Sequence, residues 1–490
     1  MKNLRTTIYL MLAVLMLLGC GIVSASTWQM KQNDQYHTAR ADYAIPPNRM
    51  NSSFFDVFLW QSTSPDSPDN GNFGGSSMPF FDGVGPDSSD IVVGTYHWPK
   101  GIQGMDRHTG QTFWYGNPDG GEVIGKTTPA FSADGSVIYV VNDWTSSGAR
   151  MMAFATTQGP ANFWGNQADP YPSHLEKPSP VVCNNDGRIF SYGWDDRPYA
   201  AQDNGTALTQ VWAAATSNSM CISNPSLWTN EDDGEIIISA GRADRVKAYD
   251  DFENEIWVTD TPDKTDATPT IDPISGNIYL AVGFGDIYFV GLDISGNYLY
   301  ESNATLLYDY EEGSNSPQRA VASGCLSHDG MTYYFQTVAE DGSGKLYAVN
   351  TETGSLKWNY NTQSKGLEET YSCPIVTSNG VVIVGNNDNG IYFAIEDQGQ
   401  ANPVLLDTFT VSAGGNARAS ATLSSDGLLY LPLRTSWVAG NGNNQVPDYS
   451  IQNLFCALDM ASDASLKLYP PGKQRVFAGN ASVLLKWIEV

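Results

Sequence analysis

Basic residues, histidines and paired cysteines are scarce in this chain of 490 residues. Lysine and arginine number 26 against 53 aspartates and glutamates, so the net charge is −27 at pH 7. Such a surface repels nucleic acid and anionic lipid headgroups. The 5 histidines are scattered without a metal-binding spacing such as HExxH. No two cysteines form a C-x-x-C pair, which excludes the common zinc and redox motifs.

Helical periodicity is also missing, and the stretch from Gly344 to Glu396 shows what replaces it. The sequence GKLYAVNTETGSLKWNY contains two alternating apolar runs joined by a Thr-Glu-Thr-Gly turn. SCPIVTSNGVVIVGNNDNGIYFAIED continues with three apolar runs between turns rich in Asn and Gly, residues that tolerate positive φ. The stretch therefore predicts a sheet of short strands, and one such sheet cannot bury its own faces.

The same unit recurs along the chain. Its first half is a small residue, often followed by Pro, before an apolar run with an Asp-Gly or Asn-Gly turn. It begins at Met78, Thr128, Ser179, Asn224, Thr268, Ser323, Cys373 and Ser420. The second half, of the type GMDRHTGQTFW, recurs in phase with the first. Eight repeats with this period indicate a propeller or a solenoid.

The second half resembles the tryptophan-docking repeat of the PQQ-like β-propellers. This family includes quinoprotein dehydrogenases and the barrel-assembly lipoprotein of Gram-negative outer membranes. The resemblance implies an all-β fold, an eight-bladed β-propeller of four-stranded antiparallel blades. In the family, the Trp of one blade packs on the turn of the next. The positions that match are Trp114, Trp164, Trp212, Trp257 and Trp358, with Tyr300 as a substitute.

The two ends of the chain have separate roles in this interpretation. Residues 1–25 are predicted to be a signal peptide, with an apolar run from Ile8 to Leu18. Leu17-Leu18-Gly19-Cys20 matches a lipobox, which would make Cys20 a lipidated N-terminus, whereas Val23-Ser24-Ala25 suits ordinary cleavage. The protein is thus expected in the periplasm, anchored to the outer membrane or outside the cell.

Residues 26–76 are predicted to be a leader and ring-closing segment, followed by the propeller over residues 77–490. Phe58-Leu59-Trp60 is expected to be an outer strand that completes a blade with the C-terminal segment. The tail SVLLKWIEV is also strand-like, so the sequence leaves open which end supplies the closing strand.

The repeat raises the hypothesis of a dehydrogenase that uses PQQ and Ca²⁺. The chain lacks the adjacent Cys-Cys pair typical of many family dehydrogenases, and no catalytic Asp or Ca²⁺ ligand matches residue by residue. No G-x-S-x-G motif is present. We therefore expect no catalytic residue, metal site or cofactor, and PQQ with Ca²⁺ belongs to the dehydrogenase alternative.

The favoured hypothesis is an exported, monomeric, non-catalytic scaffold that binds a protein or another envelope component. A carbohydrate- or cell-surface-binding module is the second alternative. Nucleic acid is not an expected partner, and the membrane is reached only through a lipid anchor. Tyr96 and Trp98 are the candidate contact surface. Cys325 and Cys373 sit near equivalent positions of neighbouring repeats, as do Cys183 and Cys221. A disulfide between repeats and buried thiols are both open, and buried thiols are the favoured interpretation.

Overall fold

The computed structural model describes most of residues 27–461. The internal residues outside the description are 53, 56–57, 63–76, 98–99, 117–126, 142–150, 166–178, 183–186, 194–196, 214–222, 231–233, 251–253, 302, 311–315, 366–371, 387–389, 400–401, 411–416, 418, 433–436, 440–444 and 448–454. Cys20 and the predicted signal peptide also lie outside the described residues.

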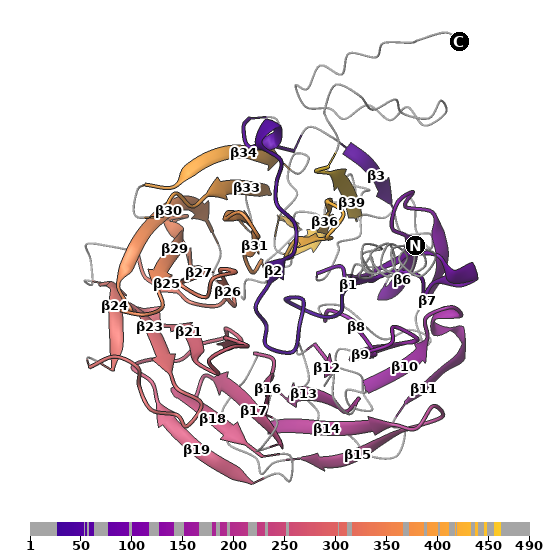
Figure 1. Cartoon of the computed structure of the whole chain (residues 1–490), viewed down its shortest axis with the longest axis horizontal. Coiled ribbons are helices and arrows are strands. Elements are labelled where there is room, and N and C mark those ends of the chain that lie inside the picture. Colours follow the sequence, from indigo (N-terminus) through magenta and orange to yellow (C-terminus); the bar gives the residue numbers. More distant parts are fainter. Residues whose placement is uncertain are drawn as a thin grey trace, which may run out of the picture.

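The described chain is all-β apart from three short 3₁₀ helices, and its sheets stand side by side around a common centre (Figure 1). Eight of the sheets have four or five strands. Within each, four strands pair antiparallel from an inner strand near the centre to an outer strand at the rim, and residues 40–41 add to one sheet in parallel (Figure 1). This arrangement is a β-propeller, and it confirms the predicted all-β architecture of four-stranded antiparallel sheets.

The first four sheets follow one another along the chain. They contain β1 (Thr27–Trp28), β4 (Phe80–Phe81), β5 (Ile91–His97), β6 (Lys100–Asp106) and β7 (Thr112–Gly116); β8 (Ala130–Phe131), β9 (Val137–Val141), β10 (Met151–Ala155) and β11 (Phe163–Gly165); β12 (Val181–Val182), β13 (Ile189–Gly193), β14 (Arg197–Asp203) and β15 (Leu208–Ala213); and β16 (Ser226–Asn230), β17 (Gly234–Gly241), β18 (Arg245–Tyr249) and β19 (Glu255–Asp260).

The next four sheets continue the series. They contain β20 (Thr270–Ile271), β21 (Ile278–Val282), β23 (Ile287–Leu292) and β24 (Ala304–Tyr308); β26 (Cys325–Leu326), β27 (Thr332–Gln336), β29 (Gly344–Asn350) and β30 (Leu356–Ser364); β2 (Arg40–Ala41), β31 (Ile375–Thr377), β32 (Val381–Gly385), β33 (Ile391–Glu396) and β34 (Val404–Thr410); and β35 (Thr422–Leu423), β36 (Leu428–Pro432), β39 (Phe455–Asp459) and β3 (Phe58–Ser62).

Smaller elements lie in the connections. They are the 3₁₀ helices η1 (Pro47–Arg49), η2 (Pro86–Ser88) and η3 (Gly159–Asn162), the pair β37 (Trp437–Ala439) and β38 (Gln445–Pro447), and the three-stranded sheet of β22 (Phe284–Gly285), β25 (Gln318–Arg319) and β28 (Val338–Ala339). Among the described residues, no helix has the length and apolar character needed to cross a membrane.

The turns predicted from Asp-Gly and Ser-Gly pairs have the backbone angles that require glycine. Gly135, Gly276, Gly330 and Gly427 have φ between +73° and +87°. These glycines join the first and second strands of their sheets, so the chain reverses after only two or three residues of the inner strand.

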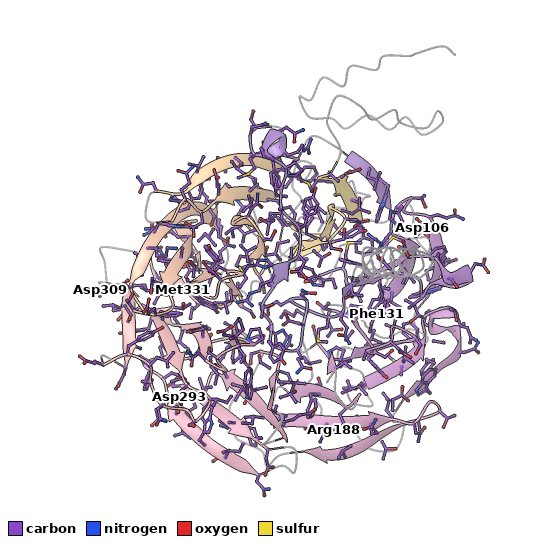
Figure 2. All side chains as sticks on the ribbon, viewed as in Figure 1. Asp106, Phe131, Arg188, Asp293, Asp309 and Met331 are labelled. Atoms are coloured by element: carbon purple, nitrogen blue, oxygen red, sulfur yellow. The ribbon has the colours of Figure 1, made fainter. Side chains whose placement is uncertain are left out.

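The core lies between neighbouring sheets rather than on one face of a single sheet. Strands in the middle of a sheet are buried along their whole length, as in β21, β27 and β32. Because each sheet packs on both of its neighbours, both of its faces are apolar. Figure 2 shows side chains filling the space between the sheets, with Phe131 near the centre and Asp309 at the rim.

The N-terminal strand β3 is the outermost strand of the last sheet. It pairs antiparallel with β39, so this sheet is built from both ends of the described chain. The sequence left open which end supplies the outer strand. Among the described residues it is supplied by Phe58–Ser62.

The segment from Trp28 to Tyr43, here called the central segment, lies across the middle of the ring (Figure 1). Its backbone carbonyls accept hydrogen bonds from the inner strands of several sheets. The donors are the N–H groups of Phe131, Leu227, Ile271, Leu326 and Val376. One short segment therefore contacts sheets that lie far apart in the sequence.

A series of hydrogen bonds, here called the belt, joins neighbouring sheets at positions just before their inner strands. The N–H of Thr128 donates to Ser179 Oγ at 2.8 Å, and the N–H of Ser179 donates to Asn224 Oδ1 at 2.9 Å. The N–H of Asn224 donates to Thr268 Oγ1 at 3.0 Å, and that of Thr268 to Ser323 Oγ at 2.8 Å. The repeat positions identified in the sequence thus link one sheet to the next.

Candidate functional site

Aromatic side chains of several outer strands contact a turn of the next sheet. Trp114 of β7 donates its Nε1–H to the carbonyl oxygen of Thr156 at 2.8 Å. A Cβ atom on Gly159 would lie 2.6 Å from this indole ring. Trp257 of β19 lies in the same way over Gly296, where an added Cβ would be 2.5 Å from the ring. Glycine is therefore required at both turns by contact as well as by positive φ.

Two further tryptophans use a carboxylate of the next sheet as the acceptor. Trp164 Nε1 donates to Asp203 Oδ1 at 2.9 Å, and Trp358 Nε1 donates to Asp397 Oδ1 at 2.9 Å. Each carboxylate also accepts a tyrosine hydroxyl of the tryptophan's own sheet, from Tyr139 and Tyr334 respectively. Burial, followed by the neighbouring carboxylate, raises the pKa of both tyrosines, so both hydroxyls remain protonated donors at neutral pH.

Tyr300 makes a similar contact with the next sheet. Its hydroxyl donates to the carbonyl oxygen of Thr351 at 2.7 Å, and its ring lies 3.0 Å from a Cβ built on Gly354. Trp212 belongs to β15, opposite Ala200, but its side chain lies outside the described residues.

Trp60 makes the same kind of contact with a neighbouring sheet, although it lies outside the repeat pattern of the sequence. It stands opposite Ala457 in β39, as Trp358 stands opposite Ala348 in β29. Its Nε1 donates to the carbonyl oxygen of Arg107 at 2.9 Å. The missing aromatic of the last repeat is thus supplied from the N-terminal strand. The available signal was the aromatic strand Phe58-Leu59-Trp60 itself.

The seventh repeat has Asp407 at the corresponding position, opposite Ala394. Asp407 Oδ2 accepts the backbone N–H of Phe55 at 3.0 Å. The Phe55 ring lies 6.0 Å from that of Phe409. A residue of the N-terminal segment therefore occupies the region where the seventh and eighth sheets meet.

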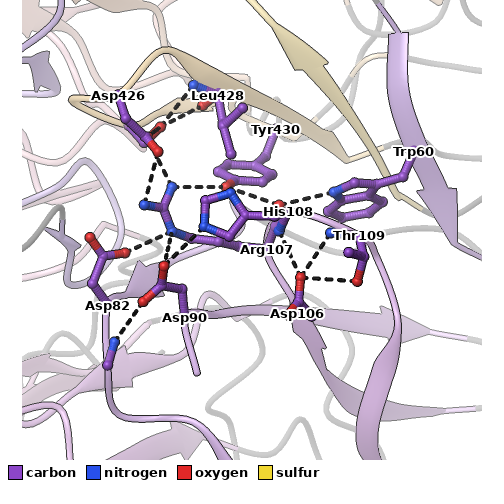
Figure 3. A network of polar contacts seen from close by, with 12 residues as sticks. Trp60, Asp82, Asp90, Asp106, Arg107, His108, Thr109, Asp426, Leu428 and Tyr430 are labelled. Atoms are coloured by element: carbon purple, nitrogen blue, oxygen red, sulfur yellow. Dashed lines mark hydrogen bonds and ion pairs between the residues drawn. The ribbon is translucent and has the colours of Figure 1, made fainter. Parts of the chain in front are cut away.

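Arg107 organises the polar network where the first and last sheets meet (Figure 3). Its guanidinium donates two hydrogen bonds to Asp426, at 2.9 and 3.0 Å, and its Nε lies 2.7 Å from Asp82. Asp90 is 3.8 Å from the same Nε, and the Tyr430 hydroxyl is 3.5 Å from Nη1. Arg107 is only 2% exposed, so these acidic groups compensate a buried cation. This set of residues is called the seam network.

The charged side chains of the seam network pair with one another, Arg107 with Asp426 and Asp82. Burial alone raises the pKa of Asp426, but hydrogen bonds from Arg107 and Ser424 outweigh it, and the pKa lies below its ordinary value. The carboxylate therefore stays ionised at neutral pH and remains paired. A general acid or base needs a proton that it can exchange near neutral pH, so this network suits joining sheets rather than catalysis.

The predicted contact surface lies outside the side chains that the structure describes. Tyr96 lies in β5 opposite Gly101, and its side chain lies outside the described residues, as does the whole of Trp98. Cys325 and Cys373 are both buried.

The two faces of the ring differ in what covers them. In an antiparallel sheet, the turn between the first and second strands and the turn between the third and fourth lie on one face. The end of the central segment lies there, since Tyr43 packs on Gly427, and just beyond it the Ile45 N–H donates to Asn379 Oδ1 at 3.0 Å. The other face, here called the crossover face, carries the turns between second and third strands and the connections between sheets. It includes the three-stranded sheet of β22, β25 and β28.

The crossover face carries a cluster of cations around one aromatic ring. Lys264 Nζ lies 5.0 Å from the centroid of Phe284, and the guanidinium carbons of Arg242 and Arg319 lie 5.4 and 5.5 Å from it. Arg242 also binds the buried Asp266 through two hydrogen bonds, at 2.6 and 2.5 Å. Phe284, half-buried, is the centre of what we call the Phe284 cluster.

The Phe284 cluster unites four connections of the crossover face. Arg242 follows β17, Lys264 lies between β19 and β20, Phe284 begins β22, and Arg319 ends β25. Aromatic and arginine side chains are among the residues that contribute most binding free energy at protein interfaces. The arrangement can present a fixed surface of mixed charge to a macromolecule.

No cluster of acidic side chains that could hold the Ca²⁺ of a PQQ site is found in the part of the chain that the structure describes. The ion would need several oxygen ligands, and no group of three or more His, Cys, Asp or Glu side chains among the described residues is placed to hold a metal ion. The carboxylates of PQQ would need cationic partners. In the Phe284 cluster, Arg242 is already paired with Asp266. No step of chemistry is therefore derived through this cofactor.

Comparison with known proteins supports a propeller of this kind. No protein-family model matches the chain. An outer membrane protein assembly factor, BamB of Yersinia pestis, is 24% identical over 214 residues, which are 41% of this chain and 49% of the relative. The chain thus matches about half the length of that curated relative.

Solved structures resemble the chain over much more of its length. The quinohemoprotein alcohol dehydrogenase of Comamonas testosteroni covers 92% of this chain, with 82% of its own chain aligned, at 13% identity and a TM-score of 0.56. The alcohol dehydrogenase ADHIIG of Pseudomonas putida HK5 has the same coverage of both chains, with 12% identity and a TM-score of 0.59. At such identities the likeness concerns the fold. The resemblance predicted from the repeats is confirmed: part of the chain is similar in sequence to BamB, and the chain shares its fold with quinohemoprotein alcohol dehydrogenases.

Proposed function

We propose that this protein is an exported, non-catalytic β-propeller that acts as a protein-binding or assembly scaffold in the cell envelope or outside the cell. In this proposal it is a monomer that binds a protein or envelope component and uses neither PQQ nor a metal. A signal peptide over residues 1–25 directs export, with Cys20 as the residue lipidated in an anchored form.

The proposed body is a ring of eight four-stranded blades. Residues 77–490 supply the repeats, and residues 26–76 close the ring through β3 and fill its centre. The eight large sheets and the pairing of β3 with β39 support this count. We also propose that Trp114, Trp164, Trp212, Trp257 and Trp358, together with Tyr300 and Trp60, dock each blade on the next.

The Phe284 cluster is the observation that carries the scaffold proposal. It places an aromatic ring and three cations on the crossover face, in a chain whose net charge is −27. Connections on the face of a rigid scaffold are where propellers can vary without disturbing the core. A relative named as an assembly factor is consistent with a protein partner.

The proposal is tested by photo-crosslinking in cells of the source organism. A photoreactive phenylalanine analogue replaces Phe284 in one strain and Ile274 in another. Ile274 is 84% exposed and belongs to the same repeat, but it lies in the turn between β20 and β21 on the opposite face, which makes it a suitable control. We expect a discrete protein adduct from position 284 and none from position 274.

Two results would overturn the proposal. Equal adducts from both positions would remove the crossover face as the partner surface. Stoichiometric binding of PQQ and Ca²⁺ by the purified protein, with oxidation of an alcohol or aldose, would make it an enzyme.

A further inference from the structure

An Asn-Gly pair stands in the turn between the last two strands of the third sheet. Asn204 and Gly205 lie between β14 and β15, and both are exposed. The preceding residue is Asp203, the carboxylate that Trp164 and Tyr139 of the second sheet contact. In an Asn-Gly pair the backbone nitrogen reaches the preceding side-chain amide with little hindrance, because glycine has no Cβ. The turn is therefore a place where the chain can react with itself.

Covalent connection alone keeps the two reacting atoms close. The nitrogen of Gly205 and Cγ of Asn204 belong to adjacent residues, so a bond between them closes a five-membered ring. A Cβ built on Gly205, whose φ is +83°, would meet no atom within 4 Å, so the space beside this residue is open in the described part of the chain. Such an intramolecular attack is much faster than the same reaction between separate molecules.

Three hydrogen bonds converge on the oxygen of the Asn204 side chain. Its Oδ1 accepts the N–H of Thr206 at 3.0 Å, the Thr206 hydroxyl at 2.9 Å and the N–H of Ala207 at 2.8 Å. Attack on Cγ places negative charge on this oxygen, and donors at these distances stabilise that charge. The hydrogen bonds that form the turn therefore also activate the amide carbon.

A carboxylate contacts the proton of the attacking nitrogen. The N–H of Gly205 donates to Asp203 Oδ1 at 2.8 Å. An amide nitrogen attacks only as it loses this proton, and a carboxylate at hydrogen-bond distance is placed to accept it as a general base. Three consecutive residues thus supply a proton acceptor, an activated carbonyl carbon and a nucleophile.

The other Asn-Gly pair among the described residues, Asn379-Gly380, has a different setting. Asn379 Nδ2 donates to the carbonyl oxygen of Ile45 at 2.9 Å, and the Ile45 N–H donates to Asn379 Oδ1 at 3.0 Å. Its amide is therefore held by a segment far away in the sequence. The N–H of Gly380 donates to the carbonyl oxygen of Thr377 at 3.0 Å, which is not a base. The same dipeptide stands once in a reactive setting and once in a protected one.

We propose that Asn204 is a self-modification site, at which the chain releases ammonia and gains an acidic residue. The Gly205 nitrogen bonds to Asn204 Cγ and gives its proton to Asp203. The Cγ–Nδ2 bond breaks, and Nδ2 leaves as ammonia with the proton that Asp203 accepted. Water then opens the cyclic imide at either of its two carbonyl groups, which yields aspartate or isoaspartate at position 204.

The two products differ in their effect on the turn. Aspartate fits it, because Asp106 in the first repeat accepts the same three kinds of hydrogen bond, from the N–H groups of His108 and Thr109 and from the Thr109 hydroxyl. Isoaspartate lengthens the backbone next to Asp203, which accepts the indole N–H of Trp164. The reaction therefore acts on one of the contacts between neighbouring sheets.

The test is peptide mass spectrometry of the purified protein after incubation, folded, at neutral pH in oxygen-labelled water. The label marks every amide that is hydrolysed during the incubation, and methylation by an isoaspartyl methyltransferase counts the isoaspartate. We expect acid to form at position 204 at least tenfold faster than at position 379. In urea the two Asn-Gly pairs should react at similar rates, because the turn and the contact with Ile45 are both lost.

Two variants separate the parts of the site. Gly205→Ala places a Cβ on the attacking residue and should slow the reaction at least tenfold, whereas Thr206→Val removes one donor to Oδ1 and should slow it severalfold. Gly399→Ala, at an exposed glycine with φ +82°, is the matched control and should leave the rate unchanged. Equal rates at positions 204 and 379 in the folded protein would overturn the proposal, as would an Asn204 that stays intact when folded but reacts in urea.

Discussion

Replacing the docking-turn glycine Gly296 by alanine should destabilise the protein much more than the same change at Gly399. The two glycines have nearly equal φ, +83° and +82°, and both occupy the turn before an outer strand. A Cβ on Gly296 would lie 2.5 Å from Trp257 Cδ2, whereas one on Gly399 would meet no atom within 4 Å. The pair therefore separates backbone strain from contact with the neighbouring sheet.

The expected loss of stability has two contributions, backbone strain at positive φ and steric contact with the Trp257 ring. An alanine in the left-handed region costs roughly 1–2 kcal/mol, and this term is common to both variants. Forcing a methyl group into an occupied contact costs a further 1–3 kcal/mol or so, because the Trp257 ring must move away from the turn. Gly296→Ala should thus lose about 1–3 kcal/mol more than Gly399→Ala.

Urea unfolding monitored by tryptophan fluorescence measures this difference, provided that the slopes of the transitions agree. Gly205→Ala is a second control, since Gly205 has φ +83° and open space around its Cβ position. If Gly296→Ala and Gly399→Ala lose the same free energy of unfolding, then the ring of Trp257 does not constrain the next sheet, and the docking interpretation is wrong.

Three further changes test other parts of the structure. Ser179→Ala should cost about 1–3 kcal/mol, because the buried N–H of Thr128 loses its acceptor at 2.8 Å. Trp60→Ala should cost about 3–5 kcal/mol, since a side chain only 6% exposed leaves a cavity where the ring closes. Burial lowers the pKa of His37 from 6.5 to about 4. Between these pH values His37 is protonated in the unfolded chain and neutral in the folded chain. Between pH 6.5 and 4 this residue should remove about 3 kcal/mol of stability as the pH falls.

Each of these changes has its own control. Ser136→Ala, at an exposed turn, should change the free energy of unfolding by less than about 0.5 kcal/mol. His37→Gln should lose less stability than wild type between pH 7 and pH 4, and an equal loss in both proteins would show that His37 is already charged when folded. A Trp60→Ala variant with the unfolding midpoint of wild type would show that β3 does not hold the last sheet.

The sequence was informative where structure is local. The repeated turns predicted the sheets, because Gly135, Gly330 and similar residues adopt angles that only glycine takes without strain. The positions that begin each repeat, such as Ser179 and Asn224, were visible as a pattern of small residues. Their role in the belt was not, because each hydrogen bond joins residues of two different repeats.

The N-terminal segment was harder to predict for the same reason. Trp28, Gln35 and Thr38 have no repeat pattern, and their partners lie in different sheets far along the chain. The backbone there adopts positive φ at Gln32 and His37, which local preferences disfavour. Contacts to the surrounding sheets determine this conformation. The Phe284 cluster has no sequence signal either, since its four residues come from four separate connections.

The seam network has a physical reason to exist at the place where the ring closes. Trp60 and Arg107 are 47 residues apart, whereas Arg107 and Asp426 are 319 apart. Loop-closure entropy grows with the logarithm of this separation, so the longer closure costs only about 2 kcal/mol more than the shorter one. The strand pairing of β3 and the docking of Trp60 are together large enough to offset that cost. The buried ion pairs of Arg107 then add little net free energy, but they penalise any other register, because a misplaced closure would leave a buried cation unpaired. Removing Arg107 and its acidic partners together should therefore affect the fidelity of ring closure more than the stability of the closed ring.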